Sequence, residues 1–173
     1  MRTYHRTTRE CPVRELRPEL HQAIQDYFQA QHLGDPETET LMCCETTSTK
    51  QPAGRLASWL EGGGAAVVHM GMLLTPQQLI WVRSADDADV VLAAADLKEI
   101  RVRAYTSPLT RDAGLEVSGV IGDSTGRVRG YIGMGPEAAA QKFCDAVEQA
   151  IAEVNPPVKR GLPKWLADLR RGA

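Results

Sequence analysis

Apolar residues between Met72 and Val82 form two short runs around a polar segment. The sequence MLLTPQQLIWV places the polar residues at 75–78. Each apolar run is too short for a helix, and Pro76 prevents the two from forming one helix together, although proline suits a turn. The pattern therefore predicts a β-hairpin whose turn is formed by residues 75–78.

Strand-like segments continue through the middle of the chain. The clearest period of two lies between Lys98 and Tyr105, where apolar and charged residues alternate. Other short apolar or β-branched segments are bounded by turn residues, which is typical of strands. Strands are predicted at 39–47, 65–74, 79–83, 90–94, 98–105, 115–121 and 127–132.

Two longer segments show helical spacing instead. A helix is predicted to begin near Pro18 and to end near Gly34, because Leu20, Ile24 and Phe28 recur on one stripe. A longer apolar stripe follows residues 135–137 and stops at 155–157, which predicts an amphipathic helix.

Two other segments lack a strong pattern. Residues 1–10 are polar, contain three arginines and show no apolar periodicity, so they predict a mobile arm. The connection 48–64 contains Leu56, Trp59 and Leu60 at helical spacing, which predicts one or two helical turns.

The composition is that of an ordinary globular domain. The chain has 173 residues, of which 43% are hydrophobic, and this length can bury a core without disulfides or metals. The net charge of −2 argues against a basic nucleic-acid-binding protein. With no apolar run near the roughly 20 residues of a membrane helix and no signal-peptide core, we expect a cytoplasmic protein.

The four cysteines are Cys11, Cys43, Cys44 and Cys144, and their spacing matches no zinc site. They are expected to be reduced and structural. Cys43 and Cys44 are adjacent, so in a strand they would point to opposite faces of the sheet. A bond between these two is therefore not expected.

Seven strands followed by one amphipathic helix predict an α+β, mostly β fold. The expected architecture is a bent antiparallel sheet, or partly open barrel, capped by the C-terminal helix, with an extra N-terminal helix. The hairpin LLTPQQLIWV at 73–82 and the LKEI step at 97–100 resemble the bacterial pleckstrin-homology-like (PH-like, or GRAM-like) family. The resemblance covers about residues 38–154.

This resemblance suggests three parts of the chain. Residues 1–37 would be an arm and a helix, 38–155 the PH-like domain, and 156–173 a basic amphipathic tail. PH-like domains bind lipid head groups, peptides or other proteins, so the resemblance implies binding and does not fix the ligand. The basic cluster of phosphoinositide binders is reduced here to Lys50 and Arg55.

Two pairs of arginines lie on predicted strands, Arg101 with Arg103 and Arg127 with Arg129. If the strands were antiparallel neighbours, the Cβ atoms of such residues would lie roughly 5 Å apart. The arginines would then bind an anionic head group or an acidic peptide through charge-assisted hydrogen bonds. The alternative is a solvated outer face whose charges pair with nearby glutamates.

The C-terminal tail combines basic residues with apolar residues at helical spacing. Such a segment folds back on its own domain, enters a groove of a partner, or lies on a membrane surface. Its candidate contact residues are Lys159, Arg160, Lys164, Trp165, Arg170 and Arg171.

These patterns predict a non-enzymatic binding module that acts through protein–protein contacts, including self-association. The alternative is a peripheral module that binds anionic lipid through the basic strands and the tail, at the inner face of the membrane. No metal, cofactor, activated nucleophile or acid–base pair is indicated by the sequence.

Overall fold

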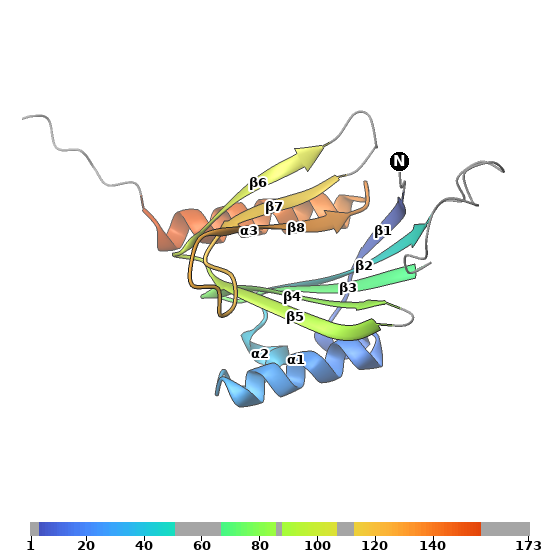
Figure 1. Cartoon of the computed structure of the whole chain (residues 1–173), viewed down its shortest axis with the longest axis horizontal. Helices are drawn as coiled ribbons and strands as arrows, with labels where there is room; N and C mark the ends of the chain where they lie inside the picture. The colour runs from blue at the N-terminus through green and yellow to red at the C-terminus, as the bar shows by residue number, and fades with distance from the viewer. Residues whose placement is uncertain (1–3, 51–66, 86–87, 107–112, 157–173) are drawn as a thin grey trace, which may run out of the picture.

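The described residues form eight strands in two antiparallel sheets, with helices on both sides of the larger sheet (Figure 1). The computed structural model describes residues 4–50, 67–85, 88–106 and 113–156. The larger sheet contains, in spatial order, β1 (Tyr4–Glu10), β2 (Met42–Lys50), β3 (Val67–Leu74), β4 (Gln78–Ala85) and β5 (Ala88–Asp96). The smaller sheet contains β6 (Ile100–Thr106), β7 (Ala113–Gly119) and β8 (Val128–Met134).

Three helices and one 3-10 turn complete the described part of the chain. They are η1 (Val13–Glu15), α1 (Pro18–Ala30), α2 (Pro36–Glu39) and α3 (Ala138–Val154). The seven predicted strands correspond to β2–β8, and the two predicted helices to α1 and α3. The first predicted strand begins three residues later than expected, because residues 36–39 form the helical turn α2.

The predicted hairpin is confirmed as β3 and β4. Leu74 lies opposite Leu79 in the register. The backbone N–H of Thr75 donates to the Gln78 carbonyl oxygen at 2.9 Å, and the Thr75 hydroxyl oxygen accepts from the Gln78 N–H at 2.9 Å. Thr75 therefore closes the turn with both its backbone and its side chain, while Pro76 stays exposed.

The prediction of a mobile arm is wrong for residues 4–10. These residues form β1, which pairs with β2 in an unbroken register from Tyr4 opposite Lys50 to Glu10 opposite Cys44. Thr8 is the only buried residue of this strand. A strand at the edge of a sheet has little apolar area to bury, so its sequence shows no hydrophobic period.

Thr8 connects the two sheets through buried hydrogen bonds. Its hydroxyl lies 2.8 Å from the hydroxyl of Thr46 in β2 and accepts from the Gly135 N–H at 2.8 Å. Gly135 directly follows β8, so this one side chain links β1 and β2 to the end of the smaller sheet. The Thr8 N–H also donates to Glu137 Oε2 at 2.8 Å.

The variant Thr8→Val is expected to lower the free energy of unfolding by about 1–3 kcal/mol. Valine has the same shape, but it leaves the Gly135 N–H and the Thr46 hydroxyl without this partner in a buried site. Urea denaturation followed by circular dichroism measures the change. Thr7→Val, on the exposed side of β1, is the matched control, and equal stability of the two variants would contradict the role of Thr8.

The larger sheet is buried on both faces where β2, β3 and β4 meet near the hairpin turn, which explains the continuous apolar runs there. Alternate residues face α1 in one core cluster and α3 in the other. Cys43 belongs to the first cluster and Cys44 to the second, as expected for adjacent strand residues. The α1 side contains Leu20, Ile24, Phe28, Cys43, Leu73, Ile80 and Val82, and the α3 side contains Cys44, Met72, Leu74, Leu79 and Phe143.

Helix α3 packs between the two sheets. It contacts β1 and β2 of the larger sheet and β6 and β7 of the smaller one. Phe143 and Val147 are fully buried there, in one cluster with Leu115 and Ile132. The described strands form two separate sheets and no closed barrel, and α3 supplies the apolar surface that covers the space between them (Figure 1).

Candidate functional site

The outer face of the smaller sheet carries a cluster of arginine and tyrosine side chains. Val102 packs toward the core, so Arg101, Arg103 and Tyr105 lie on the opposite side of β6. The register places Arg101 in one row with Arg129 and Arg103 in the next row with Tyr131. All five are exposed. We call Arg101, Arg103, Tyr105, Arg129 and Tyr131 the arginine–tyrosine face.

The strands that carry these arginines are not neighbours, so the condition for the roughly 5 Å separation is not met. β7 lies between β6 and β8, so their arginines are separated by two strand spacings, about 10 Å. Glu116 of β7 occupies the space between them and forms an ion pair with Arg129 at 3.4 Å. Arg101 and Arg103 form no ion pair with another described residue, and Arg127 is exposed directly before β8.

The two tyrosines pack against each other on this face. Their rings meet edge to face, with centroids 5.3 Å apart and an interplanar angle of 84°. The Tyr131 hydroxyl donates to the Ala113 carbonyl oxygen at 3.0 Å. Tyr105 lies opposite Gly114, which has no side chain to cover it. The pair is therefore held in place while about 40% of each tyrosine stays exposed.

Arg6 of β1 extends the cationic surface from the larger sheet. A Cβ atom at Gly133 of β8 would lie only 2.7 Å from Arg6 Nε, so the guanidinium lies directly against this glycine. Gly133 lies opposite Gly114, in the row of Tyr105. The Arg6 guanidinium also lies 5.5 Å from the centre of the Tyr4 ring. Arg6 was missed from the sequence because its strand was read as an arm.

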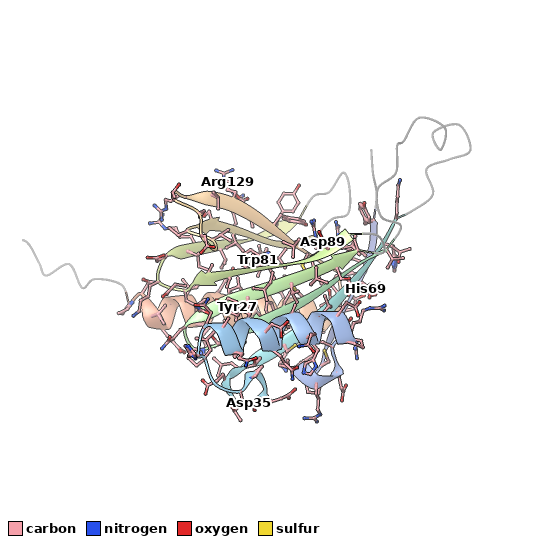
Figure 2. The ribbon with its side chains drawn as sticks, turned by 60° about the horizontal axis from the view of Figure 1, so that its bottom comes forward. Tyr27, Asp35, His69, Trp81, Asp89 and Arg129 are labelled. Atoms are coloured by element: carbon pink, nitrogen blue, oxygen red, sulfur yellow. The ribbon has the colours of Figure 1, made fainter. Side chains whose placement is uncertain are left out.

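The arginine–tyrosine face lies away from α1. Helix α1 covers the opposite side of the larger sheet, with Tyr27 toward one end of that sheet, and Arg129 lies on the remote part of the molecule (Figure 2). The face is therefore not covered by either of the long helices, because α3 packs on the inner side of the smaller sheet.

The tail candidates and the predicted helical turn in the long connection lie outside the described residues. The tail candidates are Lys159, Arg160, Lys164, Trp165, Arg170 and Arg171, and the turn contains Leu56, Trp59 and Leu60.

Two buried cysteines face each other at the end of β1. The Cys11 N–H donates to the Cys43 carbonyl oxygen at 3.2 Å, and both side chains belong to the core cluster between α1 and the larger sheet. A hydrogen bond from the Cys43 thiol lowers the pKa of Cys11, and the nearby Arg9 charge lowers it further. The same interaction, together with burial, raises the pKa of Cys43. Both residues border an open cavity of about 360 Å³.

Cys11 is expected to be alkylated first among the four cysteines. Thiolates are the reactive form, and burial raises the pKa of Cys44 to about 12 and that of Cys144 to about 11. Timed iodoacetamide labelling at mildly alkaline pH, with peptide mapping by mass spectrometry, gives the order. Urea-unfolded protein, in which all four should react alike, is the control. Earlier labelling of Cys44 or Cys144 in the folded protein would contradict this assignment.

Other chemistry-bearing residues are dispersed in the described part of the chain. His69 of β3 lies opposite Thr47, with Nδ1 3.2 Å from the threonine hydroxyl, which is a contact within the sheet. In the described ranges, no three histidine, cysteine or acidic side chains gather as a metal site would require. No described helix is long and apolar enough to cross a membrane.

These observations define a mostly β protein with two antiparallel sheets, a C-terminal helix between them and a cationic, aromatic outer face. No known protein-family profile matches the chain, and comparisons with curated proteins and with solved structures gave no significant match. The PH-like resemblance therefore stays a prediction, and we infer a function from the surface itself.

Proposed function

We propose that the protein is a non-enzymatic binding module of the PH-like kind, which binds an acidic segment of a partner protein on the arginine–tyrosine face. The strand series β2–β5, the strand series β6–β8 and the closing helix α3 support the PH-like part of the proposal. The exposed face supports the binding part, because its Arg101 and Arg103 form no ion pair with a described residue.

The observation that carries the proposal is the combination of charge and aromatic area. Arg101 and Arg103 stand on one face of one strand without an ion pair to a described residue, and the packed pair Tyr105 and Tyr131 lies beside them. Arginine binds carboxylates through two parallel hydrogen bonds. Tyrosines contribute a large contact area at a low cost in conformational entropy. A surface of this kind is suited to carboxylate-bearing chains.

The spacing of the cations favours a protein segment over a lipid head group. Arg129 is about 10 Å from the arginines of β6 and is partly neutralised by Glu116. The backbone positions of the three arginines are therefore spread over the sheet face, with Glu116 among them. Carboxylates distributed along an extended chain match this separation better.

A labelled polyglutamate peptide tests the proposal. Fluorescence anisotropy is expected to show binding at low salt that weakens steeply as ionic strength rises, because the contacts are exposed charges. A polylysine peptide of equal length is the control for nonspecific association. Flotation with phosphatidylcholine vesicles containing phosphatidylserine is the second arm. Binding to these vesicles without binding to polyglutamate would overturn the proposal in favour of the lipid reading.

A further inference from the structure

Among the described strands, β6 forms one edge of the smaller sheet. The strand order is β6-β7-β8, and no described strand pairs with the other side of β6. Figure 1 shows it as the outermost strand of the smaller sheet. An unpaired edge presents a row of backbone N–H and C=O groups that a further strand can pair with.

The burial of the inner side of β6 points to the same edge. Ile100 is 2% exposed, Val102 is half-buried and Ala104 is exposed, although Ala104 shares its row with the fully buried Leu115 and Ile132. The burial of the inward-facing side chains of β6 therefore decreases from Ile100 to Ala104. A neighbouring strand with small apolar side chains would complete it.

We infer that the open edge of β6 accepts an acidic, extended segment of a partner protein as an additional strand. This inference rests on the proposed function and specifies how the segment is bound. Carboxylates at alternate positions would lie on the outer side beside Arg101 and Arg103. The intervening small apolar residues would lie on the inner side beside Val102 and Ala104. The segment is thus recognised by the alternation of acidic and apolar residues along its sequence.

Charge repulsion disfavours two other occupants of the β6 edge, a second copy of the chain and the chain's own C-terminal tail. A second copy pairing through its own β6 would place Arg101 and Arg103 beside the same arginines of the other copy, and like charges on neighbouring strands are destabilising. The C-terminal tail of the chain has five basic residues and one acidic residue between 159 and 171, so it carries the same sign. An acidic segment from another protein is the complementary occupant.

Two labelled peptides of identical composition test the inference on the full chain. In one, glutamate and valine alternate, and in the other the glutamates and valines form two blocks. Anisotropy titration is expected to show about tenfold tighter binding of the alternating peptide, and hydrogen exchange is expected to slow at the amides of residues 101–105. Methylating the alternate backbone nitrogens on one edge of this peptide should abolish binding, while methylating the other edge should not, because only one edge pairs with β6.

The outcomes separate the inference from the proposed function. Equal binding of the alternating and block peptides, without protection of β6 amides or sensitivity to methylation, would overturn strand addition and leave acidic binding on the face intact. Binding of neither peptide, nor of polyglutamate, would overturn both. Binding of the alternating peptide by a charge-reversed Arg101→Glu/Arg103→Glu variant as tightly as by the natural protein would also overturn strand addition in this register.

Discussion

Reversing both charges in Arg101→Glu/Arg103→Glu is expected to weaken binding of an acidic peptide by at least roughly a hundredfold. Each arginine would lose a charge-assisted hydrogen bond worth about 1.5–3 kcal/mol, and the new glutamates would repel the carboxylates. The fold should tolerate the change, because both side chains are exposed and form no ion pair with a described residue. Anisotropy titration with labelled polyglutamate at low salt measures the effect.

A second double charge reversal, placed elsewhere on the protein, distinguishes the effect of where the charges lie from the effect of net charge. Arg14→Glu/Arg17→Glu changes the net charge equally, but these residues lie in η1 and directly before α1, on the side of the molecule away from the arginine–tyrosine face. The affinity for polyglutamate should change less than about threefold in this control, because salt screens the interaction between distant exposed charges. Similar losses in the two variants would mean that binding follows net charge and that the face has no particular role.

The second large expected effect is on stability. Phe143→Ala is expected to lower the free energy of unfolding by about 3–5 kcal/mol, through lost burial and a residual cavity. Phe143 is fully buried on α3, in the cluster that includes Leu115 and Ile132 of the smaller sheet and Met72 of the larger one. A loss of this size is a large part of the 5–15 kcal/mol typical of natural domains.

The control for this variant is Leu41→Ala. Leu41 is 63% exposed beside the same sheet, so its truncation should change stability by at most about 0.5 kcal/mol. Urea denaturation compares the two variants. If Phe143→Ala unfolded at the same urea concentration as Leu41→Ala, α3 could not be the element that joins the two sheets.

Residues with a strong hydrophobic period could be read from the sequence. The hairpin at Leu74 and Leu79, the α1 stripe of Leu20, Ile24 and Phe28, and the long α3 stripe all bury large apolar side chains, and burial is what creates the period. The separation of Cys43 and Cys44 onto opposite faces follows from the geometry of a strand alone.

Features that depend on strand order or on an edge could not be read in this way. β1 buries only Thr8, so its sequence resembles a solvated arm, and the contribution of Arg6 was hidden with it. Alternation along β6 and β8 shows which face each arginine occupies but not that β7 separates the two strands. The arginines and a pairing glutamate could therefore be named from the sequence, while the width of the face and the packing of Tyr105 on Tyr131 required the sheet order.

Mapping the bound acidic peptide on the protein tests the central claim most directly. Backbone amide chemical shifts of the isotope-labelled full chain, followed while unlabelled polyglutamate is added, locate the contact. We predict saturable shifts that are largest at residues 101–105, at Glu116 and at residues 129–131. Saturable shifts confined to α1 and the cavity bordered by Cys11 and Cys43, or no shifts at peptide concentrations that saturate the anisotropy signal, would contradict an acidic-segment site on the arginine–tyrosine face.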